Sequence, residues 1–407
     1  MLNSQPLHSK SSGFFDQIKG MGFFSKFSLF LTCFFIFSIP WGNAVWDGLS
    51  RIIGLLSFGV AGLAFITSGT RGKFSLFHLI IATLGAWFII SITWTPDLER
   101  GEFLLTTTVQ LLLLTMLVTF NVDNKKVNIL LAYHSYVLGN LVGSGIIIYN
   151  FINGIESIYH ERYAIPVLDI DGQSIMLTLA IPISAYLTTQ YKNKWIKLLY
   201  IMAIPTIVYA VFLTGTRTAS IVGVIGILYW LMTYRNSSLM VKTTFFIVFV
   251  ASLVGAVSLA PQESIDRIMS SGQSISSGTL NNRTVIWGAS LEQWKQAPII
   301  GNGIGSLEYI ISQKHVEYDS AHSTYIHILT ENGIIGLLLY LLIILTIIYY
   351  SLTAPFSDML FLMALLFTIL VSQITQHTHF HKETWFALTM LAIHSYAAGK
   401  ERMVKTG

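Results

Sequence analysis

The chain has 407 residues, of which 53% are hydrophobic and only 11% are charged, and its formal net charge is +4. Soluble domains carry about 25% charged residues, so this composition, with a mean hydropathy of +0.63, excludes a soluble enzyme and indicates an integral membrane protein. The small positive charge gives no indication of a nucleic-acid partner, because basic residues in membrane proteins set their orientation.

A helix that crosses a bilayer needs about 20 apolar residues, and by this measure the sequence predicts about twelve spans. We place them at 23–41, 49–68, 76–95, 102–121, 127–150, 173–190, 196–214, 217–234, 242–260, 333–352, 356–375 and 383–398. The first apolar run lacks a small-residue cleavage site, so we expect a span there and no cleaved signal peptide. The expected fold class is an all-α integral membrane protein.

Basic residues in the short connections predict the orientation, because Lys and Arg are enriched on the cytoplasmic side. With the N-terminus inside, the cytoplasmic segments carry Lys10, Lys19, Lys26, Arg71, Lys73, Lys125, Lys126, Lys192, Lys194, Lys197, Arg235, Lys242, Lys400, Arg402 and Lys405. The short outer connections carry only Arg51, Arg100, Arg162, Arg217 and Lys382. Both termini are therefore predicted to be cytoplasmic, and each outer arginine is a candidate for a specific role.

The predicted topology divides the chain into five segments. They are a cytoplasmic N-terminal segment at 1–22, nine spans over 23–260, a large outer loop at 261–332, three spans over 333–398 and a cytoplasmic tail at 399–407. Inside the large loop, Trp287 and Trp294 stand seven residues apart on one face of a predicted helix. That helix lies either at the membrane interface or on the surface of the protein itself.

Two arginines are candidates for anion binding at the outer face. Arg217 sits in TGTRTA, a very short turn between two spans, and Arg283 leads the helix of the large loop. An arginine at a helix start can bind a phosphate with two hydrogen bonds, assisted by helix N–H groups. The alternatives are an arginine that anchors its helix at the membrane surface and a solvated charge that contacts lipid headgroups.

His322 is the candidate general base. It lies in DSAHSTYIHILTENG, which predicts a helix from Ala321 to Asn332, capped by Asp319 or Ser320 and ended by Gly333. In the first turn of such a helix the dipole lowers the pKa of an imidazole, and a neutral imidazole can accept a proton. The alternative is a polar histidine in a helix cap. His327 is expected to point to a different side, which disfavours a helical two-histidine metal site.

Two further patterns are weaker. The carboxylates of Asp169 and Asp171 have the spacing of a metal-binding pair in some glycosyltransferases, but a tripeptide in a loop occurs easily by chance. His377, His379 and His381 alternate in HTHFH, which could bind a metal in an extended segment. No cysteine or further carboxylate cluster accompanies them, so we predict no metal and no other cofactor.

Three segments occur in an order that resembles the O-antigen ligase and O-antigen polymerase superfamily (WaaL- and Wzy-type proteins). They are LTGTRTASIVG, RTVIWGASLEQWKQAPIIGNGIGSLEY and SAHSTYIHILTENGIIGLLLY. The resemblance covers roughly 210–340 by motif and the whole chain by topology. It implies a GT-C-like bundle in the bacterial inner membrane, metal-independent, with a large periplasmic loop that closes a periplasmic active site.

The resemblance also implies roles for single residues. Arg217 and Arg283 would hold the pyrophosphate of an undecaprenyl-pyrophosphate-linked glycan, and His322 would activate the acceptor hydroxyl. Ser323 stands where the family often has asparagine. Arg162, in the other long outer loop, is a candidate for donor contact by position. The acceptor would be lipid A–core or a nascent polysaccharide, so ligase and polymerase both remain open.

Other function classes are a transporter or flippase of lipid-linked glycans, and a protein O-oligosaccharyltransferase of the same superfamily. A transporter would need charged residues through the interior of the bundle. The predicted spans are nearly free of charge, and the candidate groups gather on one face, which favours an enzyme that works at the membrane surface.

Overall fold

The computed structural model describes residues 21–46, 48–68, 74–123, 125–166, 168–233, 283–313 and 321–406, with a few single residues between 243 and 266. Every described secondary-structure element is a helix. The first half contains α2 (Phe23–Ser38), α3 (Gly42–Val45), α4 (Leu49–Ser68), α5 (Leu76–Ser91), η1 (Ile92–Trp94), α6 (Leu98–Val122) and α7 (Lys126–Ile152). The second contains α8 (Ile170–Gln190), α9 (Lys194–Leu213), α10 (Arg217–Thr233), α14 (Arg283–Trp294), α15 (Ser306–Gln313), α16 (Thr324–Thr353), α17 (Phe356–Thr375) and α18 (Lys382–Thr406).

The all-α membrane fold expected from the sequence is confirmed, whereas the count of twelve spans is not. Among the described residues, eight helices are long and apolar enough to cross a bilayer, namely α4, α5 with η1, α6, α7, α8, α9, α16 and α17. The apolar helices α2 and α10 are shorter. Helix α18 covers the predicted span 383–398, but it does not qualify by hydropathy. The predicted span 242–260 lies almost entirely outside the described residues.

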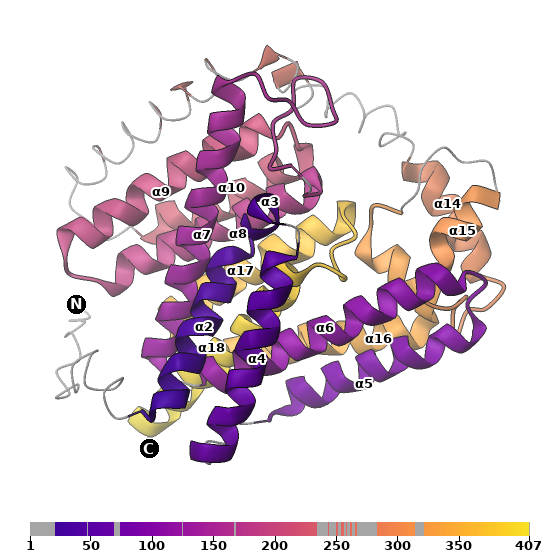
Figure 1. Ribbon diagram of the computed structural model, residues 1–407, viewed down its shortest axis with the longest axis horizontal. Helices are drawn as coiled ribbons and strands as arrows, with labels where there is room; N and C mark the ends of the chain where they lie inside the picture. The colour runs from indigo at the N-terminus through magenta and orange to yellow at the C-terminus, as the bar shows by residue number, and fades with distance from the viewer. Residues whose placement is uncertain are drawn as a thin grey trace.

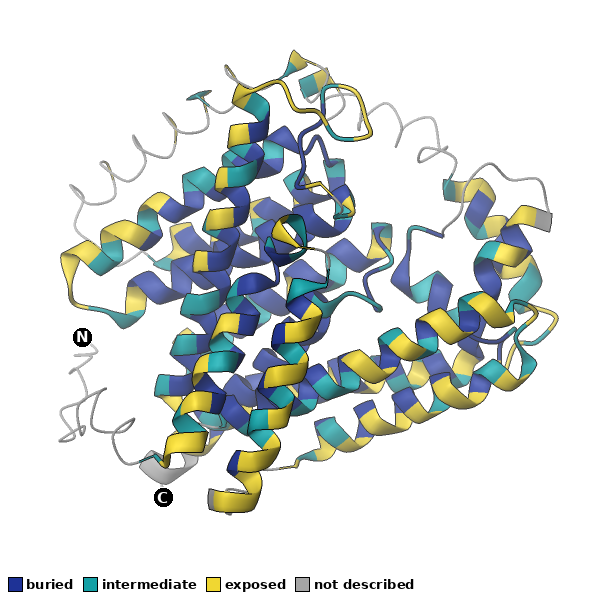
Figure 2. Ribbon diagram, in the orientation of Figure 1, coloured by how far each residue is buried: buried dark blue, intermediate teal, exposed yellow. Residues whose placement is uncertain are grey.

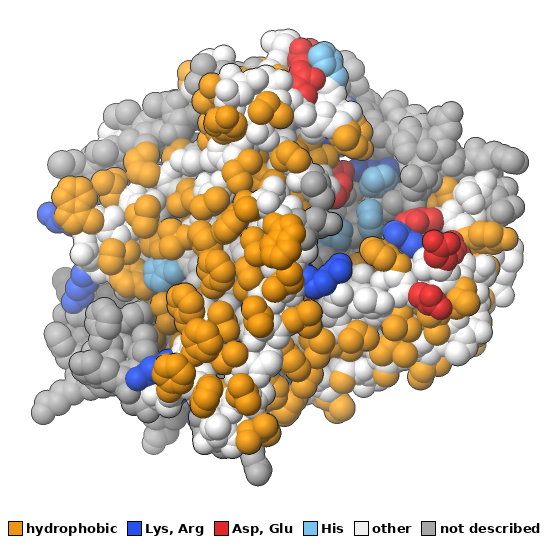
Figure 3. All heavy atoms as spheres, in the orientation of Figure 1, with side chains coloured by type: hydrophobic (Ala, Val, Ile, Leu, Met, Phe, Trp, Pro, Cys, Tyr) orange, Lys and Arg blue, Asp and Glu red, His pale blue; other side chains and the backbone are white. Residues whose placement is uncertain are grey.

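The core of the bundle is built around α8. This helix packs against α9, α10, α17 and α7, and nearly all of its residues are buried. Figure 2 shows the buried residues concentrated there, with exposed residues on the outer helices α2, α4, α5 and α6. The exposed side chains on α2 and α4 are largely apolar, as in Phe30 and Leu55, and Figure 3 shows that hydrophobic side chains cover this face. Such a surface is suited to lipid and not to water.

Helices α5, α6 and α16 extend together to one side of the bundle, and α14 and α15 lie against the far end of this arm (Figure 1). Helix α14 packs on both α16 and α15. Of the two placements considered for it, the structure therefore shows packing on the protein itself. The indole N–H of Trp287 donates to the carbonyl of Ala321 over 2.8 Å, which ties this helix to the segment before α16.

Helix α16 is interrupted at Gly333, where the backbone has φ 65° and ψ −167°. This region is open almost only to glycine. The interruption agrees with the expected helix end at Gly333, but the chain becomes helical again at once and continues to Thr353. At the other end, the helix begins at Thr324, with Ser323 as its N-cap. The prediction of a helix that begins at Ala321 is therefore wrong.

The loop after α14 binds to the backbone that this break exposes. Amides of Asn302 and Gly303 donate to the carbonyls of Thr330 and Glu331 over 3.0 and 2.8 Å. In return, the amides of residues 334 and 335 donate to the carbonyls of residues 298 and 299 over 3.0 and 3.3 Å. The glycine-rich GNGIG sequence therefore packs against a broken helix and is explained by that contact.

We predict that Gly333→Ala destabilises the protein. A Cβ at this position would lie 2.2 Å from the carbonyl oxygen of Ile299, and the backbone conformation is one that alanine strongly disfavours. We expect a loss of at least about 2 kcal/mol, measured as a lower midpoint of thermal unfolding in detergent.

Gly145→Ala is the matched control. It lies inside α7 with no atom within 4 Å of the added Cβ, so its effect should be neutral or stabilising by less than about 1 kcal/mol. An unchanged midpoint for Gly333→Ala would contradict the role assigned to the interruption.

Candidate active site

The residues singled out in the sequence come from three distant segments. Arg217 is the first residue of α10, Arg283 is the first residue of α14, and His322 lies two residues before α16. Asp171, in the first turn of α8, joins them. Figure 3 shows a recess to the right of centre in which histidine, basic and acidic side chains gather on a largely hydrophobic face.

His322 is held by its backbone neighbours on both sides. The carbonyl of Ala321 accepts from Trp287, and Thr324 donates through its amide and its hydroxyl to the carbonyl of Gln376 over 3.0 and 2.9 Å. His322 itself has φ 43°, a left-handed conformation that costs a residue other than glycine about 1 kcal/mol. Strained backbone of this kind is concentrated at functional sites.

The position of His322 corrects one part of the sequence reasoning. We expected it in the first turn of a helix, where the dipole would lower its pKa, but it precedes the N-cap Ser323. Its pKa is nevertheless lowered, chiefly by burial and then by the positive charge of Arg283, while Asp171 and Asp169 act in the opposite direction. The imidazole is therefore favoured in its neutral form for reasons other than the helix dipole.

The charges of Arg217 and Asp171 both act on Arg283. The pKa of Arg283 is lowered by burial and by the charge of Arg217, and the carboxylate of Asp171 partly offsets both. Charges influence one another in this way only when they lie close together. The structure therefore brings Arg217, Arg283 and His322 into one electrostatic neighbourhood, with Asp171 as the acidic member that sequence reasoning treated only as a metal candidate.

Arg162 lies beneath this neighbourhood and is only 5% exposed. Its Nε donates to the carbonyl of Thr214 over 2.7 Å, and its Nη2 donates to the hydroxyl of Thr216 over 3.1 Å and lies 3.4 Å from Asp171 Oδ1. The hydroxyl of Thr216 also donates to Asp171 over 3.1 Å. These contacts fix the turn that leads into Arg217, so Arg162 positions other site residues; a contact with the donor stays a prediction.

Histidines continue from His322 along the loop between α17 and α18. The ring centroid of His377 lies 6.0 Å from that of His322, 5.9 Å from that of His327 and 5.9 Å from that of His381. His322 and His327 thus both face His377, although the sequence suggested different sides. We call His322, His377 and His381 the histidine row.

The two ends of the histidine row differ in their affinity for a proton, because the pKa of His322 is lowered and that of His381 is raised. Burial and the neighbouring histidines lower the pKa of His377. At His381 burial also opposes protonation, but the carboxylate of Glu383, 3.0 Å from Nδ1, raises the pKa overall. The row therefore runs from a neutral imidazole beside Arg283 to one that favours a proton beside Glu383.

No metal site stands out among the described residues. Within them, no group of three or more His, Cys, Asp and Glu side chains is arranged to hold a metal ion. Asp169 accepts from the amide of Gly172 over 2.6 Å and caps α8, which explains one member of the aspartate pair. Asp171 is engaged by Thr216 and Arg162.

Comparison with known proteins agrees with the motifs. Residues 202–341 match the family model described as O-antigen ligase. The matched segment begins in α9 and ends in α16, so it contains Arg217, Arg283 and His322. No curated protein matches the chain. The family match confirms the resemblance seen in the motifs and supports membership of the O-antigen ligase and polymerase superfamily.

Proposed function

We propose that the protein is a bacterial membrane glycosyltransferase that takes a glycan from undecaprenyl pyrophosphate and joins it to a sugar hydroxyl of an acceptor. The acceptor is lipid A–core or a growing O-antigen or exopolysaccharide chain. The observation that carries the proposal is the convergence of Arg217, Arg283 and His322 from three separate segments. The O-antigen ligase match over 202–341 supports the same reaction class.

The proposed reaction proceeds in one displacement step. The acceptor hydroxyl oxygen attacks the anomeric carbon, and the bond from that carbon to the pyrophosphate oxygen breaks as the new glycosidic bond forms. His322 takes the hydroxyl proton, as a neutral imidazole can. Arg217 and Arg283 stabilise the negative charge that develops on the departing undecaprenyl pyrophosphate. A single displacement inverts the configuration at the anomeric carbon.

The rest of the site serves positioning and charge balance. Asp171 and Thr216 hold the turn before Arg217 in place through Arg162. Fixed donors and a fixed base lower the barrier because little reorganisation is needed when the substrates meet. We place this site at the periplasmic face of the inner membrane, on the strength of the basic-residue asymmetry between the connections.

Replacement of the three residues tests the assignment. We expect His322→Ala to reduce transfer from purified undecaprenyl-pyrophosphate-linked glycan by roughly 10²–10⁴-fold, the range for loss of a general base. Arg217→Ala and Arg283→Ala should each reduce kcat by on the order of 10- to 1,000-fold. The assay uses purified protein whose thermal midpoint shows that it is folded.

His160→Ala is the matched control for the base. His160 also lies in an outer segment, but its side chain is 76% exposed and pairs with acidic neighbours in its own loop. Its activity should equal that of the wild type. Normal turnover by folded His322→Ala would refute the base assignment, and activity lost in EDTA and restored by a divalent ion would refute metal independence.

The pH dependence of kcat/KM reports the same group in the free enzyme. Because only neutral His322 can accept the proton, activity should be present above its pKa and fall as the pH drops through it. Burial and Arg283 lower that pKa from 6.5, so the acid limb should lie below pH 6.5. Residual activity of Arg283→Gln should show an acid limb at higher pH, and an unmoved limb would contradict the electrostatic coupling.

The surface glycan of a strain that lacks this protein shows whether the protein acts as a ligase or as a polymerase. Loss of a ligase leaves long chains that are not attached to lipid A–core, whereas loss of a polymerase leaves single attached repeat units. A gel of the extracted glycan distinguishes these patterns. Loss of surface glycan with repeat units accumulating inside the cell would instead indicate a flippase and would overturn the proposed transfer reaction.

A further inference from the structure

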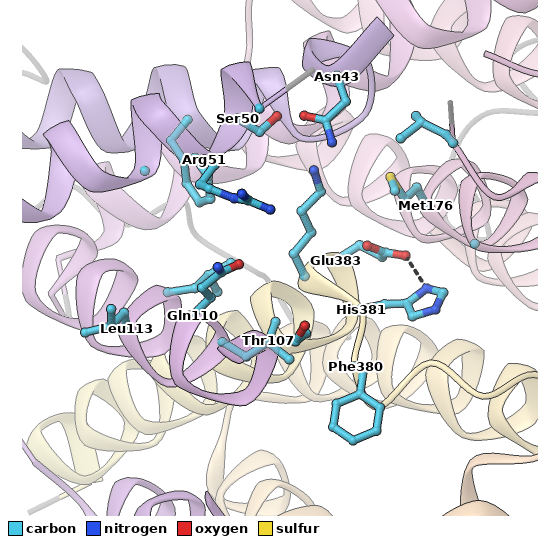
Figure 4. Close-up of a pocket in the computed structure, with 18 of the residues that line it drawn as sticks. Asn43, Ser50, Arg51, Thr107, Gln110, Leu113, Met176, Phe380, His381 and Glu383 are labelled. Carbon is cyan, nitrogen blue, oxygen red and sulfur yellow. Dashed lines mark hydrogen bonds and ion pairs between the residues drawn. The ribbon is translucent and has the colours of Figure 1, made fainter. Parts of the chain in front are cut away.

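A cavity of about 410 Å³ lies beside the histidine row, between α4, α6, the start of α8 and the start of α18. Its volume falls in the range of small-molecule sites. Figure 4 shows Arg51, Asn43 and Glu383 directed toward the same space, with His381 and Glu383 in contact at its edge. None of the roles proposed above uses this cavity.

The wall between α4 and α6 is apolar. Leu55, Phe58, Leu113, Leu114 and Leu117 line it, with Met176 of α8 opposite. Leu55 is 60% exposed on the outer face of α4, so the apolar wall continues onto the surface that faces lipid. A hydrocarbon chain could enter from the bilayer without crossing a polar barrier.

The other end of the cavity is cationic. Arg51 and Lys382 line it, and no carboxylate of the described residues lies within ion-pair distance of either. Of the two acidic residues at the cavity, Asp169 caps α8. Glu383 contacts His381, and its charge also acts on Lys382, where it opposes the effect of burial on that cation. An apolar chamber with two cations at one end is complementary to an amphiphile with an anionic headgroup.

The cavity and the two arginines of the site lie toward different ends of the histidine row. His381 lines the cavity. The ring centroid of His377 lies 5.9 Å from that of His381 and 6.0 Å from that of His322, which lies near Arg283. A transferase with two lipid-anchored substrates must bring the acceptor hydroxyl and the donor's anomeric carbon together at one base. The phosphates of the two lipids then need separate cation sites. The arrangement has two cationic regions, with the candidate base near one of them and His377 and His381 leading from it to the other.

We propose that the cavity between α4 and α6 holds the lipid anchor of the acceptor, with hydrocarbon against the leucines and phosphate on Arg51 and Lys382. This inference rests on the proposed transferase function, in which the donor pyrophosphate occupies Arg217 and Arg283. The acceptor sugars then extend past His381 and His377 toward His322. The ligand class is a phosphate-bearing lipid, which fits both lipid A–core and an undecaprenyl-pyrophosphate-linked chain.

Steady-state kinetics of the purified protein in phosphatidylcholine nanodiscs test the assignment. The double variant Arg51→Gln/Lys382→Gln should raise the KM for the acceptor lipid, supplied as lipid A–core or as the undecaprenyl-pyrophosphate-linked repeat unit, by about tenfold or more. The KM for the donor should not change. Lys295→Gln removes an exposed cation that does not line the cavity, and it should leave both constants unchanged.

A second measurement is independent of turnover. Native mass spectrometry should show that the wild type retains added phosphatidylglycerol in preference to phosphatidylcholine, and that the double variant loses this preference. Leu113→Trp fills the apolar half of the cavity from a half-buried position and keeps both cations. It should reduce retention of both lipids, and inorganic phosphate alone should not compete.

The outcomes separate the cavity from the reaction. A raised acceptor KM together with lost lipid retention supports the proposal. Lost retention with an unchanged acceptor KM means that the cavity holds bulk phospholipid, and it overturns the acceptor assignment, as does a rise confined to the donor KM. Unchanged retention in both variants overturns the lipid site itself. If the wild type transfers no glycan but retains lipid through Arg51 and Lys382, the proposed function fails while the anionic-lipid site stands.

Discussion

The interruption of α16 at Gly333 is the constraint on which the rest of the site depends. A broken helix exposes backbone N–H and C=O groups that must find partners within the protein, since lipid offers none. Here the segment 298–303 supplies those partners through four backbone hydrogen bonds to residues 330, 331, 334 and 335. The side chain of Asn332 donates to Ser91 over 3.1 Å, and the indole of Trp87 donates to its carbonyl over 3.0 Å. The break is therefore paired on one side with the loop and on the other with α5.

This pairing joins elements that are distant in sequence. Because the loop 298–303 connects α14 to α15, its attachment to α16 holds both helices against the far end of the arm formed by α5, α6 and α16. Trp287 of α14 in turn holds Ala321, and Gln376 holds Thr324, so His322 is fixed between two anchored neighbours. The strained backbone of His322 is maintained by these contacts, as strain must be maintained by its surroundings. The candidate base is thus positioned mainly by tertiary contacts.

This explains which features the sequence could predict. The expected span 356–375 coincides with α17, and the expected end of a helix at Gly333 corresponds to the interruption, because hydrophobic length and glycine act locally. The start at Thr324 depends on Gln376, 52 residues away, and local capping preferences carry no information about such a contact. His377 lies near both His322 and His327. It directly follows Gln376, so this proximity depends on the same contact. Position in the outer connections singled out the three candidate site residues one by one, but no local pattern predicts that they meet, and only the resemblance to a family implies it.

The charge distribution gives the site a preference for an anion before any substrate is considered. Arg283 is largely buried close to Arg217, and both burial and that neighbour disfavour its charge. One carboxylate, Asp171, offsets this only in part, and it is shared with Thr216 and Arg162. Burial is the largest of these effects, and an incoming diphosphate would give the Arg283 guanidinium a further negative partner, so part of its binding energy would come from relief of a desolvation cost already present in the fold. After the pyrophosphate leaves, the cost returns. The unfavourable burial of the Arg283 charge therefore favours binding of the next donor headgroup each time the site is empty.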